Sequence, residues 1–201
     1  MTVKSGCTTA RKDQMTMFER FPGTNIPAES ITQESAKLML DNLFAGGGLV
    51  LSQVTALGNM EVYSVQNWVK RGFISPPVAK KYSKRQFCRL VLINMLRDCM
   101  PIADIAELLS YINGVLSDES DDMVSDDLLY EYFIGMLSRL DSTDPDIVES
   151  TAKLVTQDYS EPREGAADRL RCVLCIIYFA YRAALLRHES DARINMYVKK
   201  I

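Results

Sequence analysis

Four polar side chains in one short segment could read the edges of base pairs: Tyr63, Ser64, Gln66 and Asn67. The carboxamides of Gln and Asn can donate to and accept from adenine at once, and hydroxyl groups can bond phosphate oxygens. Cations that could hold phosphates follow at short intervals. The candidate set for DNA contact is Tyr63, Ser64, Gln66, Asn67, Lys70, Arg71, Lys80, Lys81, Tyr82, Lys84, Arg85 and Arg89. The alternative is a solvated polar face on a packing helix.

The charge distribution supports the first interpretation. The 201 residues carry a net charge of −3, but residues 49–103 hold eight basic and two acidic side chains, whereas residues 104–161 hold two basic and fifteen acidic ones. The cationic surface is therefore local, and the net charge of the chain is a poor guide to its partners. The acidic stretch is either a solvated loop or a nucleic-acid mimic that screens the basic residues within the chain.

Catalytic and metal-binding patterns are weak. His188 is the single histidine, so neither a catalytic triad nor a zinc site built from it with Cys172 and Cys175 is complete. These two cysteines lie one turn apart in an apolar pattern, which predicts buried thiols. Residues 118–129 lack the glycine and the final glutamate of a calcium loop. We expect no catalytic residues, metal or cofactor.

Location and partners follow from composition. The longest apolar run in the C-terminal third, residues 173–181, is too short to span a bilayer and is flanked by Arg171 and Arg182. The N-terminus has no apolar signal core, and the five cysteines show no disulfide framework. We therefore expect a cytoplasmic protein with reduced thiols and no membrane partner.

Periodicity and capping signals predict helices nearly throughout. A first helix is expected from Ser30, in a capping box with Gln33, to about residue 43, followed by a glycine hinge at 46–48. Helices at 51–57 and 61–71 enclose the Gly58-Asn59 turn, and Gly72 ends the second. Trp68 belongs to the buried stripe of that second helix.

Further helices complete the chain. Pro76 and Pro77 predict an extended connector, with room for a two-stranded wing at 74–82. Ser83 and Gln86 open a helix to about residue 99 whose exposed first turns carry Lys84, Arg85 and Arg89. The remaining helices are expected at 101–112, 127–140, 145–157 and 162–187, with Asp144 capping the third.

Four runs in this order resemble the MerR-type winged helix-turn-helix: residues 51–57, 68–74, 81–83 and 100–109. More closely, residues 51–130 resemble a bacterial family that is known as a domain of unknown function and described as carrying a MerR-like DNA-binding fold. The resemblance implies a DNA-binding module. The chain differs from MerR regulators in having Gln66-Asn67-Trp68 where they carry an Arg-Tyr-Tyr-type run, and in lacking a recognisable coiled-coil dimerisation helix.

The sequence thus predicts an all-α protein in three parts. Residues 1–48 form an N-terminal segment with one helix, residues 49–112 a MerR-like helix-turn-helix, and residues 113–201 an acidic loop and a helical bundle that dimerises or senses an unknown effector. The predicted function is that of a bacterial transcriptional regulator that binds double-stranded DNA as a homodimer, without catalysis. The alternative is a protein-interaction adaptor whose acidic middle region engages a basic partner.

Overall fold

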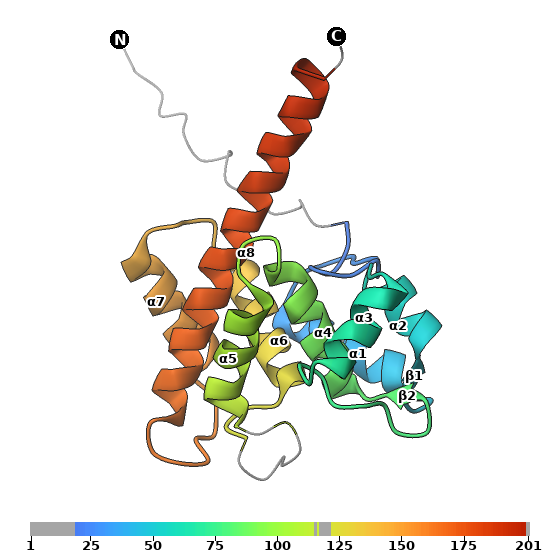
Figure 1. The fold of residues 1–201 in the computed structure, drawn as a ribbon. Helices are drawn as coiled ribbons and strands as arrows, with labels where there is room; N and C mark the ends of the chain where they lie inside the picture. The colour runs from blue at the N-terminus through green and yellow to red at the C-terminus, as the bar shows by residue number, and fades with distance from the viewer. Residues whose placement is uncertain (1–18, 115, 117–121, 200–201) are drawn as a thin grey trace, which may run out of the picture.

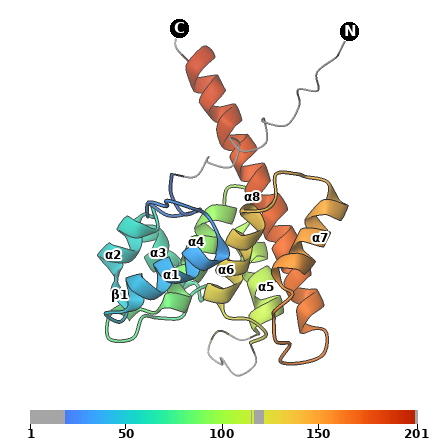
Figure 2. The same cartoon turned by 180° about the vertical axis from the view of Figure 1, so that it is seen from behind.

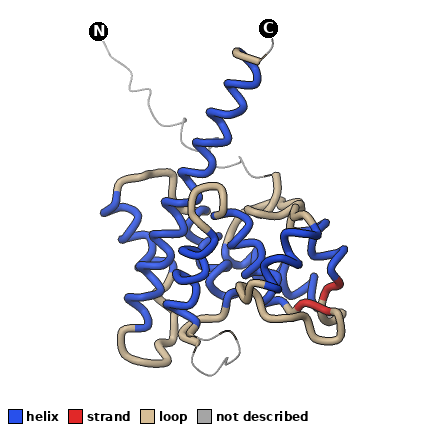
Figure 3. The backbone as a smooth tube through the Cα atoms, in the orientation of Figure 1, coloured by secondary structure: helices blue, strands red, loops and turns tan. Residues whose placement is uncertain are grey.

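The computed structural model describes residues 19–114, 116 and 122–199. This part of the chain is mostly helical, with one two-stranded sheet (Figures 1 and 3). None of its helices is both long and apolar enough to cross a membrane. The elements are α1 (Gln33–Phe44), β1 (Leu49–Val50), α2 (Leu51–Leu57), α3 (Val62–Lys70), β2 (Lys81–Tyr82), α4 (Lys84–Leu96), α5 (Ile102–Asn113), α6 (Asp126–Leu137), α7 (Pro145–Val155) and α8 (Ala166–Tyr197).

Helix α1 begins later than predicted. Its N-cap is Thr32, whose hydroxyl accepts from the Ser35 amide while the Ser35 hydroxyl accepts from the Thr32 amide. The predicted box of Ser30 with Gln33 is therefore wrong, because Thr32 and Ser35 offer the same spacing two residues on. Before α1, Phe21 is buried in the core, and the Tyr130 hydroxyl donates to the Pro22 carbonyl at 2.8 Å.

The helices predicted at 51–57 and 61–71 are present as α2 and α3, separated by the Gly58-Asn59 turn. Asn59 takes the left-handed conformation in the turn, with φ of 51°, and Gly72 takes it after α3, with φ of 77°. Both are positions where a small or amide side chain lowers the steric cost. Val65 and Trp68 are buried, which confirms the predicted packing face of α3.

The two-stranded sheet forms between unexpected partners. Strand β2 pairs antiparallel with β1, which immediately precedes α2, and Leu49 lies opposite Tyr82. Gly48 allows this approach, since a Cβ there would lie 2.8 Å from the Tyr82 carbonyl oxygen. The predicted wing within 74–82 is thus reduced to a tight turn in the wing loop, residues 73–80, closed by the bridge from Val78 to Lys81.

Helices α4 and α6 pack against each other at the centre of the body. Helix α1 covers α6 on one side, and α5 and α8 cover the pair on another (Figures 1 and 2). From Phe87 to Leu96 almost every residue of α4 is buried, as its all-round apolar sequence predicts. One hydrophobic cluster runs from Phe21 to Tyr181 and so draws on all three of the predicted parts.

The C-terminal helices differ from prediction mainly at their ends. Helices α6 and α7 stop before residues 140 and 157, whereas α8 continues to Tyr197 and projects from the body (Figure 1). Asp144 caps α7 as predicted, accepting from the amides of Asp146 and Ile147. The predicted burial of both Cys172 and Cys175 is wrong: Cys172 is exposed and Cys175 half-buried, because the core-facing side of α8 falls on other residues.

Candidate nucleic-acid interface

The outer face of α3 presents three of its four candidate reading residues to solvent. Tyr63 is 72% exposed, and Gln66 and Asn67 are also exposed. Ser64 is 5% exposed and lies on the packing side of the helix with Val65. Its expected contact with DNA is therefore wrong for this conformation, because a buried hydroxyl cannot reach a phosphate without a rearrangement of the helix.

Four further candidate cations are exposed in α3, at its end and in the segment that follows it. Lys70 and Arg71 end α3, and Lys80 and Lys81 follow in the wing loop and β2; all four are exposed. None of them forms an ion pair with a carboxylate in the part of the chain that the structure describes. The Arg71 guanidinium lies 4.6 Å from the centre of the Phe73 ring, which orients it along the surface.

The wing loop presents its cations from a strained turn. Ala79 and Lys80 have φ of 49° and 64°, and the Lys81 amide donates to the Val78 carbonyl at 2.9 Å. Two consecutive left-handed residues form the turn that suits a tight hairpin, although asparagine and glycine are the usual choices there. Val78 is 81% exposed beside this turn. Strained residues of this kind often mark functional sites.

The remaining candidates are not available to DNA in this structure. Tyr82 is 4% exposed because its ring enters the core from β2, where it lies opposite the buried Leu49. Lys84 of α4 lies between two carboxylates, with its Nζ 3.0 Å from Asp41 and 3.2 Å from Asp127. Burial alone would lower the pKa of Lys84, but the hydrogen bonds to both aspartates outweigh it and the pKa is raised. The prediction that Lys84 is free to hold a phosphate is wrong for this conformation, because two aspartates already bind its ammonium group.

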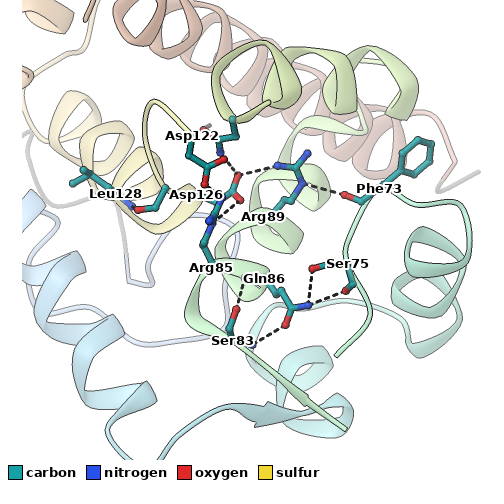
Figure 4. A network of polar contacts seen from close by, with 11 residues as sticks. Phe73, Ser75, Ser83, Arg85, Gln86, Arg89, Asp122, Asp126 and Leu128 are labelled. Atoms are coloured by element: carbon teal, nitrogen blue, oxygen red, sulfur yellow. Dashed lines mark hydrogen bonds and ion pairs between the residues drawn. The ribbon is translucent and has the colours of Figure 1, made fainter. Parts of the chain in front are cut away.

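Arg85 and Arg89 point into an ionic network instead of toward solvent (Figure 4). The Arg89 guanidinium donates to Asp126 at 3.2 Å and to the carbonyl oxygen of Phe73 at 3.0 Å, and the residue is 3% exposed. Arg85 pairs with Asp122 and lies 3.8 Å from Asp126. The predicted exposure of Arg89 is wrong, since one turn after Arg85 the helix is already inside the protein.

The electrostatics of Asp126 reflect its position at the centre of this network. Burial raises the pKa of its carboxyl, although the charges of Arg89 and Arg85 oppose that shift. The Asn113 amide adds a hydrogen bond of 3.0 Å at the end of α5. The network therefore ties the chain after α3 to the start of α6. Asp122 pairs with Arg85 and so screens its charge within the chain. The acidic residues just before it, at 118–121, lie outside the described part.

Gln86 fixes the wing loop, a role that sequence reasoning missed. Its side-chain oxygen accepts from the Ser83 amide in the predicted capping box, and its side-chain nitrogen donates to the carbonyl and hydroxyl oxygens of Ser75. The predicted capping box of Ser83 and Gln86 is confirmed, and in it the side-chain nitrogen of Gln86 points toward the wing loop. The second partner lies eleven residues away, and no local pattern indicates it.

Two pockets adjoin this region. One of about 350 Å³ lies between the wing loop and α4, lined by Ile74, Val78, Lys81, Arg85 and Asp126 among others. A second, of about 300 Å³, lies between the α2–α3 turn, the end of α4 and α8. No group of three or more histidine, cysteine or acidic side chains suited to a metal ion occurs among residues whose placement is described.

Comparison with known proteins covers the same part of the chain. Residues 35–133 match the model of a family described as "Domain of unknown function (DUF1836)". The match runs from α1 through α6 and so includes both the exposed face of α3 and the ionic network.

One bacterial protein is also similar to part of this chain. "Uncharacterized protein YkrK" of Bacillus subtilis (strain 168) is 28% identical over 125 residues, which cover 57% of this chain and 54% of the relative. The chain thus spans about half the length of that relative. No solved structure shows significant similarity to the chain. The chain is thus similar to this family over residues 35–133 and to an uncharacterized bacterial protein over 125 residues.

Proposed function

We propose that the protein is a bacterial transcriptional regulator that binds double-stranded DNA through the exposed face of α3. The observation that carries the proposal is the pairing of two exposed carboxamides, Gln66 and Asn67, with exposed cations that have no carboxylate partner in the described structure. A helix of this width fits the major groove, and carboxamides discriminate adenine there.

The order of elements supports a winged helix-turn-helix of MerR-like type. Strand β1, helices α2 and α3, the wing loop and β2 follow one another, and the pairing of β2 with β1 fixes the end of the wing loop next to the start of α2. In this arrangement α3 enters the groove while Lys80 and Lys81 contact the neighbouring backbone. The interface we propose comprises Tyr63, Gln66, Asn67, Lys70, Arg71, Lys80 and Lys81.

A salt titration of binding to random duplex DNA tests the proposal. Each phosphate neutralised lowers the slope of log K against log salt by about 0.9, so four cations predict a slope of about −3.6 for each copy bound. A protein that shows no salt-dependent binding to duplex DNA would contradict the proposal and favour the adaptor alternative.

Two variants separate reading from backbone contact. Asn67→Ala should lower the preference for one base pair by about 1–3 kcal/mol. Lys81→Ala should weaken binding to all sequences alike and reduce the salt slope by about one unit. Lys153→Ala is the matched control, because Lys153 is exposed on α7, outside the proposed interface. Equal binding by all three variants and the wild type would exclude this face.

A further inference from the structure

The pocket between the α2–α3 turn, the end of α4 and α8 has the features of a small-molecule site. We call it the junction pocket, and its volume is about 300 Å³. Its lining comes from four parts of the chain: the segment before α1, the α2–α3 turn, the end of α4 and the middle of α8. Sites for small molecules have volumes of roughly 300–1,000 Å³, so the junction pocket has room for a compound of metabolite size.

Tyr181 of α8 lines this pocket, and its hydroxyl has no hydrogen-bond partner within the described structure. The residue is 8% exposed, and its ring packs edge-on against Phe133, with 5.4 Å between the ring centres. Burial raises the pKa of Tyr181 to about 12, so the hydroxyl keeps its proton at neutral pH and can donate it. Buried polar groups of folded proteins nearly always have a partner, so the partner of this hydroxyl comes from outside the chain.

Asn94 of α4 adds a second incomplete polar group to the lining. Its side-chain nitrogen donates to the carbonyl oxygens of Gly58 and Asn59, at 3.3 and 3.4 Å, which fixes the direction of the carboxamide. Its side-chain oxygen is buried and has no donor in the part of the chain that the structure describes. A buried acceptor without a donor costs about 1–3 kcal/mol. A molecule that accepts from Tyr181 and donates to Asn94 carries hydroxyl or amide groups.

Arg97 sets the charge at the mouth of the pocket. It is exposed, and it forms no ion pair with a carboxylate among the residues whose placement is described. Its guanidinium lies 5.8 Å from the centre of the Trp68 ring, which orients the side chain. The neighbouring Asp98 carboxylate is already paired with His188 at 2.8 Å. The cation that is left without a partner therefore favours a ligand with a negative charge.

We propose that the junction pocket binds a small organic anion that also carries a hydroxyl or amide group. The anionic group pairs with Arg97 at the mouth, and the hydroxyl or amide reaches Tyr181 and Asn94. Met95 and Ala184 contribute buried apolar surface to the same pocket, and this surface covers the carbon skeleton of the ligand. A guanidinium binds carboxylate and phosphate groups alike, so the two kinds of anion are separated by experiment.

A ligand in this pocket connects the α2–α3 turn with α8. Asn94 already holds the carbonyl groups of that turn, and α3 follows the turn at Val62. A molecule bonded to both Asn94 and Tyr181 therefore stabilises the arrangement of α3 and α8 in which the outer face of α3 is exposed. This regulatory consequence rests on the proposed function, whereas the binding site does not.

Isothermal titration calorimetry of the full chain tests the site. The probes are malate and succinamate, which are carboxylates with a hydroxyl or an amide, and glycerol 3-phosphate, which is a phosphate with hydroxyl groups. At least one should bind with a Kd of about 1 mM or tighter, and the probe that binds identifies the anionic group. Succinate, which is malate without its hydroxyl, should bind about 10-fold more weakly than the best probe. Failure of all three probes to bind, or succinate binding as tightly as the best of them, overturns the inference.

Two variants locate the bound probe. Tyr181→Phe should weaken binding about 5-fold without changing the midpoint of urea unfolding, because its hydroxyl bonds no group in the described structure. Tyr178→Phe is the matched control: its hydroxyl donates to the Ser142 carbonyl at 2.8 Å outside the pocket, so its loss should lower stability and leave binding unchanged. Arg97→Gln should weaken binding about 10-fold or more, whereas Arg193→Gln, on the exposed end of α8, should not. Wild-type affinity in both Tyr181→Phe and Arg97→Gln contradicts the site.

Duplex DNA binding in the presence of the probe separates this site from the proposed function. A saturating probe should raise the affinity of the wild type for duplex DNA by about 5-fold or more. A protein that binds the probe but no duplex DNA would support the pocket and refute the proposed function. Equal DNA affinity with and without bound probe would contradict the regulatory consequence.

Discussion

Replacing Glu131 by glutamine should stabilise the protein at neutral and alkaline pH. Glu131 is 6% exposed on α6, facing Lys37 and Asp41 of α1 and Lys84 of α4. Burial is the main cause, and the nearby Asp127 charge the second, of a rise in its pKa from 4.5 to about 7. The two lysines lower the pKa but do not offset the burial.

The size and sign of the effect follow from proton binding. The folded protein holds this proton more tightly than the unfolded chain, so stability from the group is complete below about pH 4.5 and declines as pH rises through about 7. A shift from 4.5 to about 7 corresponds to at most about 3–4 kcal/mol. Because solvent reaches part of the side chain, we expect Glu131→Gln to add about 1–2 kcal/mol at pH 8 and little at about pH 5.

Urea unfolding of both proteins across this pH range measures the difference directly. Glu34→Gln provides a control of opposite sign, since hydrogen bonds from its own backbone amide and from Thr32 lower the pKa of Glu34. That variant should be less stable than the wild type by the same amount at pH 5 and pH 8, because the stability from a lowered carboxyl pKa is fully present above about pH 4.5 and is lost only below it. A stability gain from Glu131→Gln that is the same at pH 5 and pH 8, or no gain at either, would refute the assignment of a buried, proton-binding carboxyl.

Three further changes test the interior network and the sheet. Arg89→Met should cost about 3–5 kcal/mol in free energy of unfolding, because it leaves the buried Asp126 carboxylate without its cation, and adding Asp126→Asn should restore much of that loss. Lys80→Gly should raise the thermal midpoint, because glycine avoids the steric cost of about 1 kcal/mol that a left-handed backbone imposes on lysine. The same change should weaken the proposed DNA binding through the lost charge. Gly48→Ala should destabilise the protein by about 1–3 kcal/mol in urea, since its Cβ would crowd the Tyr82 carbonyl; an unchanged midpoint would contradict that close approach.

Local signals predicted much of the fold. The Ser83–Gln86 box, the Asp144 cap and the turn at Asn59 depend on residues a few positions apart, and each is present in the structure. The outer face of α3 was also predictable, because apolar residues that recur every three to four positions lie on one side of a helix and the polar residues between them lie on the other.

The ionic partners of α4 were not predictable in the same way. Asp126, the partner of Arg89, lies 37 residues later in the chain. Asp41, a partner of Lys84, lies 43 residues earlier. In a sequence, a charged first turn of a helix indicates a solvated or ligand-binding face, because the neighbouring helices that supply its ionic partners are not yet known. The length of α8 was underestimated for a related reason, since its projecting half lacks the strongly apolar pattern that marks a packed helix.

The position of Arg89 affects how the part of the chain that we propose to bind DNA could be isolated. Its guanidinium bonds the chain just after α3 and the first residue of α6, and Asn113 at the end of α5 shares that carboxylate. A recombinant fragment ending at residue 112 would lack Asp126 and would leave the Arg89 guanidinium without its carboxylate partner in an apolar interior. A fragment that keeps this carboxylate must therefore extend at least through α6, which also retains the helix that packs against α1.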